Sequence, residues 1–100
     1  MTTAPMPSLL RLDGELTIFR AHECKQALLD AIEPGATVDC DLSGVTEFDT
    51  VGVQLLLLAK REAGARGAAL RLSGHSPAVL AAFELLDLGR HFGDALVLPA

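Results

Sequence analysis

The segment Thr37 to Leu42 alternates strictly between polar and apolar residues, and this pattern constrains the fold more than any other feature of the sequence. Successive side chains of a strand point to opposite faces of its sheet, so one face of this strand is apolar and the other polar. A doubly wound sheet, covered on both faces, would contain unbroken apolar strands instead. The alternation therefore predicts a sheet that helices cover on one face only. The apolar positions are Val38, Cys40 and Leu42, and the polar positions are Thr37, Asp39 and Asp41.

Three helices are predicted from apolar residues that recur at steps of three and four. The first covers residues 21–32 and ends at Pro34-Gly35. The second covers residues from about 49 to 64. The third opens at Ser76-Pro77, with Ser as N-cap and Pro in the first helical position, and it stops near Gly89.

Strands are expected between and before these helices. Asp13-Gly14 lies between two apolar runs, which is a strong hairpin signal, and it predicts antiparallel strands over residues 9–12 and 15–19. Further strands are expected over residues 68–72 and 95–98. Strands that alternate with helices in this order predict an α/β fold, with a mixed, mainly parallel sheet of about five strands and the helices packed on one face.

The chain length and composition fit one domain. Of the 100 residues, 1–7 are expected to be a disordered leader and 8–100 a single domain. Half of the residues are hydrophobic, so a core can form without a disulfide or a metal. Cys24 and Cys40 lack metal-binding or redox spacing and are expected to be small buried side chains. No cofactor is expected.

Charge and motifs exclude several classes of function. The net charge of −5 disfavours nucleic-acid binding. No signal peptide is recognisable, and no stretch approaches the roughly 18 apolar residues that a membrane span requires, so we expect a cytoplasmic protein with no direct membrane insertion. The sequence contains no nucleophile elbow, P-loop or dinucleotide motif, and acid–base chemistry by Asp39, Asp41 or a histidine is the weakest alternative. The chain is therefore not expected to be an enzyme.

Three stretches carry a family pattern, and they occur in the family order. These are residues 11–16, residues 41–45 followed by 48–53, and residues 76–79 with the later 86–88. Together they resemble the STAS domain, the fold of bacterial anti-sigma-factor antagonists, over roughly residues 8–98. The resemblance implies a non-enzymatic signalling domain whose partner is an anti-sigma factor or a related serine kinase.

The resemblance also implies a switch at Thr50. In the family, a Ser or Thr that directly follows an Asp at the start of the second helix is phosphorylated by a partner kinase, and the pair here is Asp49-Thr50. Two residues depart from the family pattern: Thr17 stands where many antagonists have Asp, and Val51 stands where a small hydroxyl residue is usual. The residues expected to bind the partner are Glu15, Thr17, Glu47, Asp49, Thr50, Val51, Gly52, Val53 and Gln54.

Other interpretations of Thr50 stay open. An Asp-Thr pair also occurs in the small STAS subunit of a bacterial phospholipid-transport ABC system, where the Thr serves docking. That likeness implies a subunit that docks on an ABC-transporter ATPase, or on a chemosensory complex, without phosphorylation. From the residues alone, Asp49 and Thr50 are both good N-caps, so Thr50 can also be a purely structural cap.

The chemistry of a helix N-terminus agrees with a switch at this position. A phosphate would bring about −1.5 to −2 charges to the positive end of the helix dipole, and it would repel an acidic partner patch. Gly52 is expected to leave the first turn open to a partner backbone. The four leucines of residues 55–58 predict either an exposed apolar strip that binds a partner or complete burial.

Overall fold

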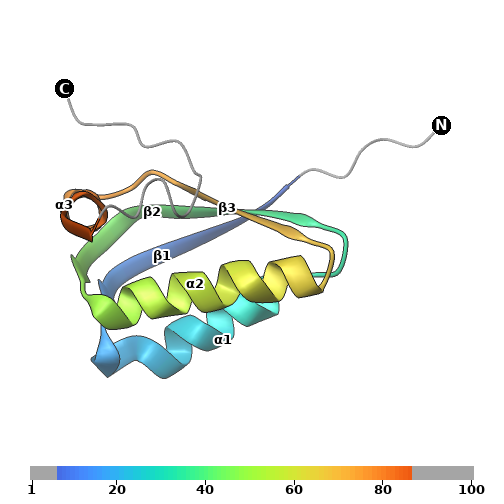
Figure 1. Cartoon of the computed structure of the whole chain (residues 1–100), viewed down its shortest axis with the longest axis horizontal. Coiled ribbons are helices and arrows are strands. Elements are labelled where there is room, and N and C mark those ends of the chain that lie inside the picture. The colour runs from blue at the N-terminus through green and yellow to red at the C-terminus, as the bar shows by residue number, and fades with distance from the viewer. Residues whose placement is uncertain (1–6, 87–100) are drawn as a thin grey trace.

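The computed structural model describes residues 7–86, which form a parallel sheet and its helices (Figure 1). The sheet has the strand order β1-β2-β3, and both neighbouring pairs are parallel. The elements in chain order are β1 (Ser8–Leu16), the 3-10 helix η1 (Ile18–Arg20), α1 (Ala21–Ala31), β2 (Thr37–Phe48), α2 (Thr50–Ala65), β3 (Ala69–Ser73) and α3 (Pro77–Leu86).

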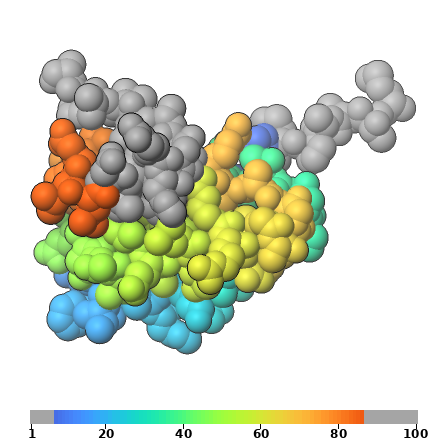
Figure 2. Space-filling view, viewed as in Figure 1, coloured from blue at the N-terminus to red at the C-terminus, as the bar shows by residue number. Residues whose placement is uncertain are grey.

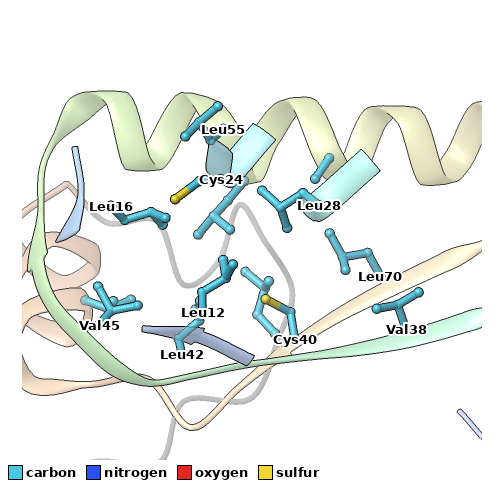
Figure 3. Close-up of a cluster of buried hydrophobic side chains, with 14 of the residues drawn as sticks. Leu12, Leu16, Cys24, Leu28, Val38, Cys40, Leu42, Val45, Leu55 and Leu70 are labelled. Carbon is cyan, nitrogen blue, oxygen red and sulfur yellow. The ribbon is translucent and has the colours of Figure 1, made fainter. Parts of the chain in front are cut away.

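Helices α1 and α2 lie side by side on one face of the sheet, and α3 lies beside the C-terminal end of β2 (Figure 1). The apolar residues Val38, Cys40 and Leu42 are fully buried at 0% exposure and point toward the helices (Figure 3). Leu56 of α2 meets them at 0% exposure. The α/β class and the one-sided sheet that the alternation predicts are both confirmed.

The opposite face of the sheet carries paired charges. Arg71 on β3 forms a salt bridge of 2.8 Å with Asp39 on β2. Asp41 accepts hydrogen bonds from the backbone N–H of Ser43 at 2.9 Å and from Arg11 at 3.3 Å. These contacts, the Ser43 N–H first, lower the pKa of Asp41 below its ordinary value. Asp39 and Asp41 are thus solvated strand residues held by arginines.

The predicted hairpin at Asp13-Gly14 is wrong. Both residues lie inside the single strand β1, which pairs with β2 on either side of them, and the register shifts before Asp13 and after Gly14. Gly14 has a φ of +78°, a conformation that serves a bulge as readily as a turn. The strand continues because Leu12 and Leu16, on both sides of the irregularity, are buried in the same core. The strand expected over residues 15–19 stops at Leu16, and η1 follows.

The three helices begin where the sequence predicts. At α3, the backbone N–H of Val79 donates to Ser76 Oγ at 3.3 Å, and Pro77 is the first helical residue, so the predicted cap is confirmed. Strand β2 extends to Phe48, well beyond its alternating part. The helix stop at Gly89, the strand over residues 95–98 and residues 1–6 of the expected leader lie outside the described residues.

The far ends of α1 and α2 are joined by one guanidinium group. Arg66, directly after α2, donates to the backbone oxygens of Leu29 at 3.1 Å and Ile32 at 2.7 Å, and it forms a salt bridge of 3.2 Å with Glu62. The carbonyls at the end of a helix lack the usual partners of the helix interior. Arg66 therefore supplies a donor to the Ile32 carbonyl and a second donor to that of Leu29, which also accepts from the Ile32 N–H, and it fixes the two helices against each other.

Candidate functional site

The N-terminus of α2 directly follows β2 and is capped by Asp49. Asp49 has extended backbone (φ −130°, ψ −166°). Its Oδ1 accepts from the backbone N–H of Val51 at 2.9 Å and of Gly52 at 3.4 Å. Of the two residues that the sequence left as candidates for the cap, the structure therefore selects Asp49.

Thr50 is the first residue of α2, and its side chain is exposed. Because Asp49 is the cap, the purely structural interpretation of the Thr50 hydroxyl as an N-cap is wrong. Within residues 7–86 the hydroxyl makes no hydrogen bond. It stands at the end of a helix where unpaired N–H groups and the dipole favour negative charge.

Gly52 is needed for packing within the domain. A Cβ at this position would lie 2.7 Å from the carbonyl oxygen of Leu16 and 2.7 Å from the ring of Phe48. The first turn of α2 therefore rests on the ends of β1 and β2, and only glycine fits there. The expectation that Gly52 clears space for a partner does not describe its surroundings, because Gly52 is buried.

Two carboxylates meet at the same end of the sheet. Glu15 on β1 and Glu47 on β2 are register partners. The side-chain hydrogen bond with Glu15, followed by its charge, raises the pKa of Glu47. Thr17 is 7% exposed, and its hydroxyl donates to Glu15 Oε2 at 3.5 Å. Each carboxylate therefore adds to the negative potential around the other.

The structure brings only part of the predicted partner-binding set to the surface. Thr17, Gly52 and Val53 are buried, so we leave them out of the contact surface, and Val51 is half-buried. The remaining residues are exposed or half-exposed, and we call them the α2 entrance surface. They are Glu15, Glu47, Asp49, Thr50 and Gln54.

Two exposed apolar residues near this end are on η1. Leu55 and Leu56 are buried and the other two leucines of residues 55–58 are half-buried, so α2 carries no exposed strip. Ile18 and Phe19 are instead 68% and 87% exposed. Sequence reasoning missed them because a β-branched residue next to an aromatic one is typical of a strand.

The fold and the site together define a class of protein. A parallel sheet covered on one face, with an exposed hydroxyl residue at the start of the helix after the central strand, is the arrangement that the family resemblance implies. A family model described as "Mlab, STAS domain" (STAS_2) matches residues 2–98. The chain belongs to this STAS domain family.

Two solved structures are similar to the chain. One is the anti-sigma factor antagonist SpoIIAA in its unphosphorylated form, with 25% identity and a TM-score of 0.65, covering 95% of this chain and 85% of that one. The other is the STAS domain of a SulP transporter from Vibrio cholerae, with 18% identity and a TM-score of 0.65, covering 92% of this chain and 72% of that one. The second likeness shows the fold alone. A search of curated protein sequences gave no match.

The described part of the chain offers neither a cluster of metal ligands nor a membrane-spanning helix. Residues 7–86 contain no group of three or more His, Cys, Asp or Glu side chains that could hold a metal ion. Within the same residues, no helix is both long enough and apolar enough to span a bilayer. Cys24 and Cys40 are both buried, and burial raises the pKa of the Cys24 thiol.

Proposed function

We propose that this STAS domain is a non-enzymatic, anti-sigma-factor-antagonist-like signalling module of the cytoplasm. It binds a serine kinase or anti-sigma factor through the α2 entrance surface, and phosphorylation of Thr50 switches the partner. The observation that carries the proposal is the Thr50 hydroxyl, which is exposed and has no structural duty because Asp49 caps the helix. The similarity to an anti-sigma factor antagonist over 95% of the chain supports it.

A phosphate on Thr50 would act through charge and size. It would add about −1.5 to −2 charges beside Asp49 and Glu47. The added negative charge changes the electrostatic interaction between the α2 entrance surface and its partner, and the added bulk displaces a partner that packs closely against the hydroxyl. Helix α2 keeps its cap during this change, so the switch needs no refolding of the domain.

The test is mass spectrometry after incubation with the cognate kinase and ATP, followed by affinity measurements on variants. We expect one phosphate on Thr50, and none on the Thr50→Ala variant. Thr50→Glu is expected to change partner affinity by at least about tenfold, equivalent to about 1.4 kcal/mol. Thr50→Gln has the same size without the charge, so it separates the two effects. An unmodified Thr50, together with unaltered binding by Thr50→Glu, would contradict the proposal.

A second candidate function is docking without phosphorylation. It is favoured by the Asp49-Thr50 pair, because the resemblance extends to the small STAS subunit of a phospholipid-transport ABC system, which carries the same pair. In this case the partner is an ABC-transporter ATPase, or a component of a chemosensory complex, and the Thr50 hydroxyl contacts it directly. Thr50→Ala would then weaken assembly in the absence of any kinase, which co-purification measures.

A further inference from the structure

Ile18 and Phe19 place two large apolar side chains side by side in water. Their exposures are 68% and 87%, whereas most of the aliphatic side chains of the described residues are buried or half-buried. Apolar residues that stand alone on a surface are ordinary, but adjacent ones at the edge of a candidate binding site indicate an interaction surface.

The backbone of η1 holds the two side chains outward. The backbone N–H of Arg20 donates to the carbonyl of Thr17 at 3.1 Å, which closes the turn. The Arg20 guanidinium donates to the carbonyl oxygens of Asp13 and, at 3.3 Å, of Glu15, and it forms a salt bridge with Glu23 at 3.2 Å. The turn is therefore tied to β1 and α1, and a partner that binds it has little chain entropy to overcome.

Helix η1 lies next to the start of α2. The first turn of α2 rests on the carbonyl of Leu16, and Ile18 is two residues further along the chain. Consecutive Cα atoms are about 3.8 Å apart, so the Cα of Ile18 lies within about 8 Å of that of Leu16. Figure 1 shows η1 at the same end of the molecule as the beginning of α2, and Figure 2 shows the two segments as neighbours on the surface.

The charges around Ile18 and Phe19 are mainly negative. Glu15 and Glu47 are register partners on β1 and β2. A positively charged partner group placed opposite this pair would be attracted by both residues. Asp49 adds a third exposed carboxylate, and Glu23 is already engaged with Arg20, the only cation that the described contacts place here. The hydrogen bond with Glu15, followed by its charge, raises the pKa of Glu47, which agrees with the close approach of the two carboxyl groups.

We propose that Ile18 and Phe19 form the apolar centre of the partner contact, and that the partner presents apolar side chains rimmed by lysine or arginine. The proposal rests on the proposed function, because it names the chemistry of the partner at the α2 entrance surface. Large apolar side chains at the centre of a protein interface carry most of its binding energy, while complementary charges at the rim set partner choice and association rate.

The test uses two synthetic 12-residue peptides with the same leucine residues, one with arginines between them and one with glutamates, each titrated into the ¹⁵N-labelled protein. We expect the arginine peptide to shift the amide signals of residues 15–20 and 47–54. Its affinity should exceed that of the glutamate peptide by at least about tenfold and should fall in 0.5 M salt (about a 4 Å screening length).

Matched variants identify the apolar centre. Phe19→Ser is expected to weaken binding of the arginine peptide at least about fivefold. Leu9→Ser removes a side chain that is 74% exposed near the far end of β1, the strand that precedes η1, and it should leave binding unchanged. Equal shifts with both peptides, shifts confined to other residues, no shifts at all, or equal losses in the two variants would overturn the proposal. Phosphorylation of Thr50 is measured separately, so failure of one proposal does not imply failure of the other.

Discussion

At the scale of the residue, Asp49 and Thr50 have different roles at the candidate site. Asp49 satisfies the N–H groups at the start of α2, and Thr50 next to it contributes its backbone to the helix and its hydroxyl to the surface. Helix stability limits which side chains a capping position tolerates, whereas an exposed first helical position tolerates many.

Substitutions at these two positions should therefore differ in their effect on stability. Asp49→Ala is expected to lower the free energy of unfolding by about 1 kcal/mol, because Val51 and Gly52 lose their acceptor. Thr50→Val should change it by less than about 0.5 kcal/mol. Urea denaturation of both variants checks this, and an equal loss in both would show that the hydroxyl has a structural duty.

The carboxylate pair predicts a pH dependence. Glu15 raises the pKa of Glu47 in the folded protein above its ordinary value of 4.5, so the folded state binds more protons than the unfolded state above that pH. Stability contributed by this group is thus present at low pH and is lost as the pH rises through the folded pKa. Glu47→Gln should raise the free energy of unfolding at pH 7 but not at about pH 4. Denaturation at both pH values checks it, and a gain that is independent of pH would contradict the interpretation.

At the scale of the element, the start of α2 is fixed by what lies beneath it. Gly52 packs against the end of β1 and the ring of Phe48. Phe48 in turn packs against Phe83 of α3, and the centroids of the two rings are 6.1 Å apart. The first turn of α2 is therefore connected through Phe48 to β2 and α3. A distortion at Gly52 would reach the α2 entrance surface directly.

Two glycines of the same helix test this packing. Gly52→Ala is expected to destabilise the domain by about 1–3 kcal/mol, because its Cβ has no space. Gly64→Ala is the matched control: no atom lies within 4 Å of its Cβ position, so it should stabilise by about 0.5–1 kcal/mol. Thermal unfolding of the two variants should give shifts of opposite sign, and shifts of the same sign would contradict the packing argument.

The same scale shows what the sequence could and could not predict. Helices α1 and α3 follow local spacing and capping signals, so their positions were predictable. Asp13-Gly14 was misinterpreted because a bulge and a hairpin turn both use a glycine with positive φ, and the choice depends on pairing with β2, which is remote in sequence. The same error hid the exposure of Phe19, because a predicted strand over residues 15–19 gave no reason to place this side chain in a surface turn.

The candidate site, like the fold, was predictable from the sequence only in part. Thr50 and Asp49 were predictable from their position between a strand and a helix, since that order places them at a helix N-terminus. The burial of Thr17 and Val53 was not predictable, because it depends on how β1 and α2 pack against each other. Family resemblance supplied the position of the site, and only the three-dimensional contacts show which of its residues a partner can reach.

At the scale of the whole molecule, the two faces of the sheet have different roles. The helix-covered face is a continuous aliphatic core (Figure 3), and the other face holds its carboxylates in pairs with Arg11 and Arg71. Exposed ion pairs contribute little to stability, whereas removal of a buried side chain leaves a cavity. The stability of the domain therefore depends on one face.

Two truncations should show this asymmetry. Leu56→Ala, at a position with 0% exposure, is expected to cost about 2–5 kcal/mol. Arg71→Ala removes the exposed salt bridge with Asp39 and should leave the denaturation midpoint nearly unchanged. Guanidinium denaturation of both variants gives the comparison, and a loss of similar size in both would mean that the charged face is structural as well.

The cap formed by Asp49 has a practical consequence for position 50. Because the neighbouring Asp49 caps the start of α2, residue 50 can be substituted with little effect on folding. A cysteine there would accept a spectroscopic label or a tether, and a library of all side chains would report interaction preferences alone. In such a screen, loss of binding could be attributed to recognition, since the scaffold would be the same in every member.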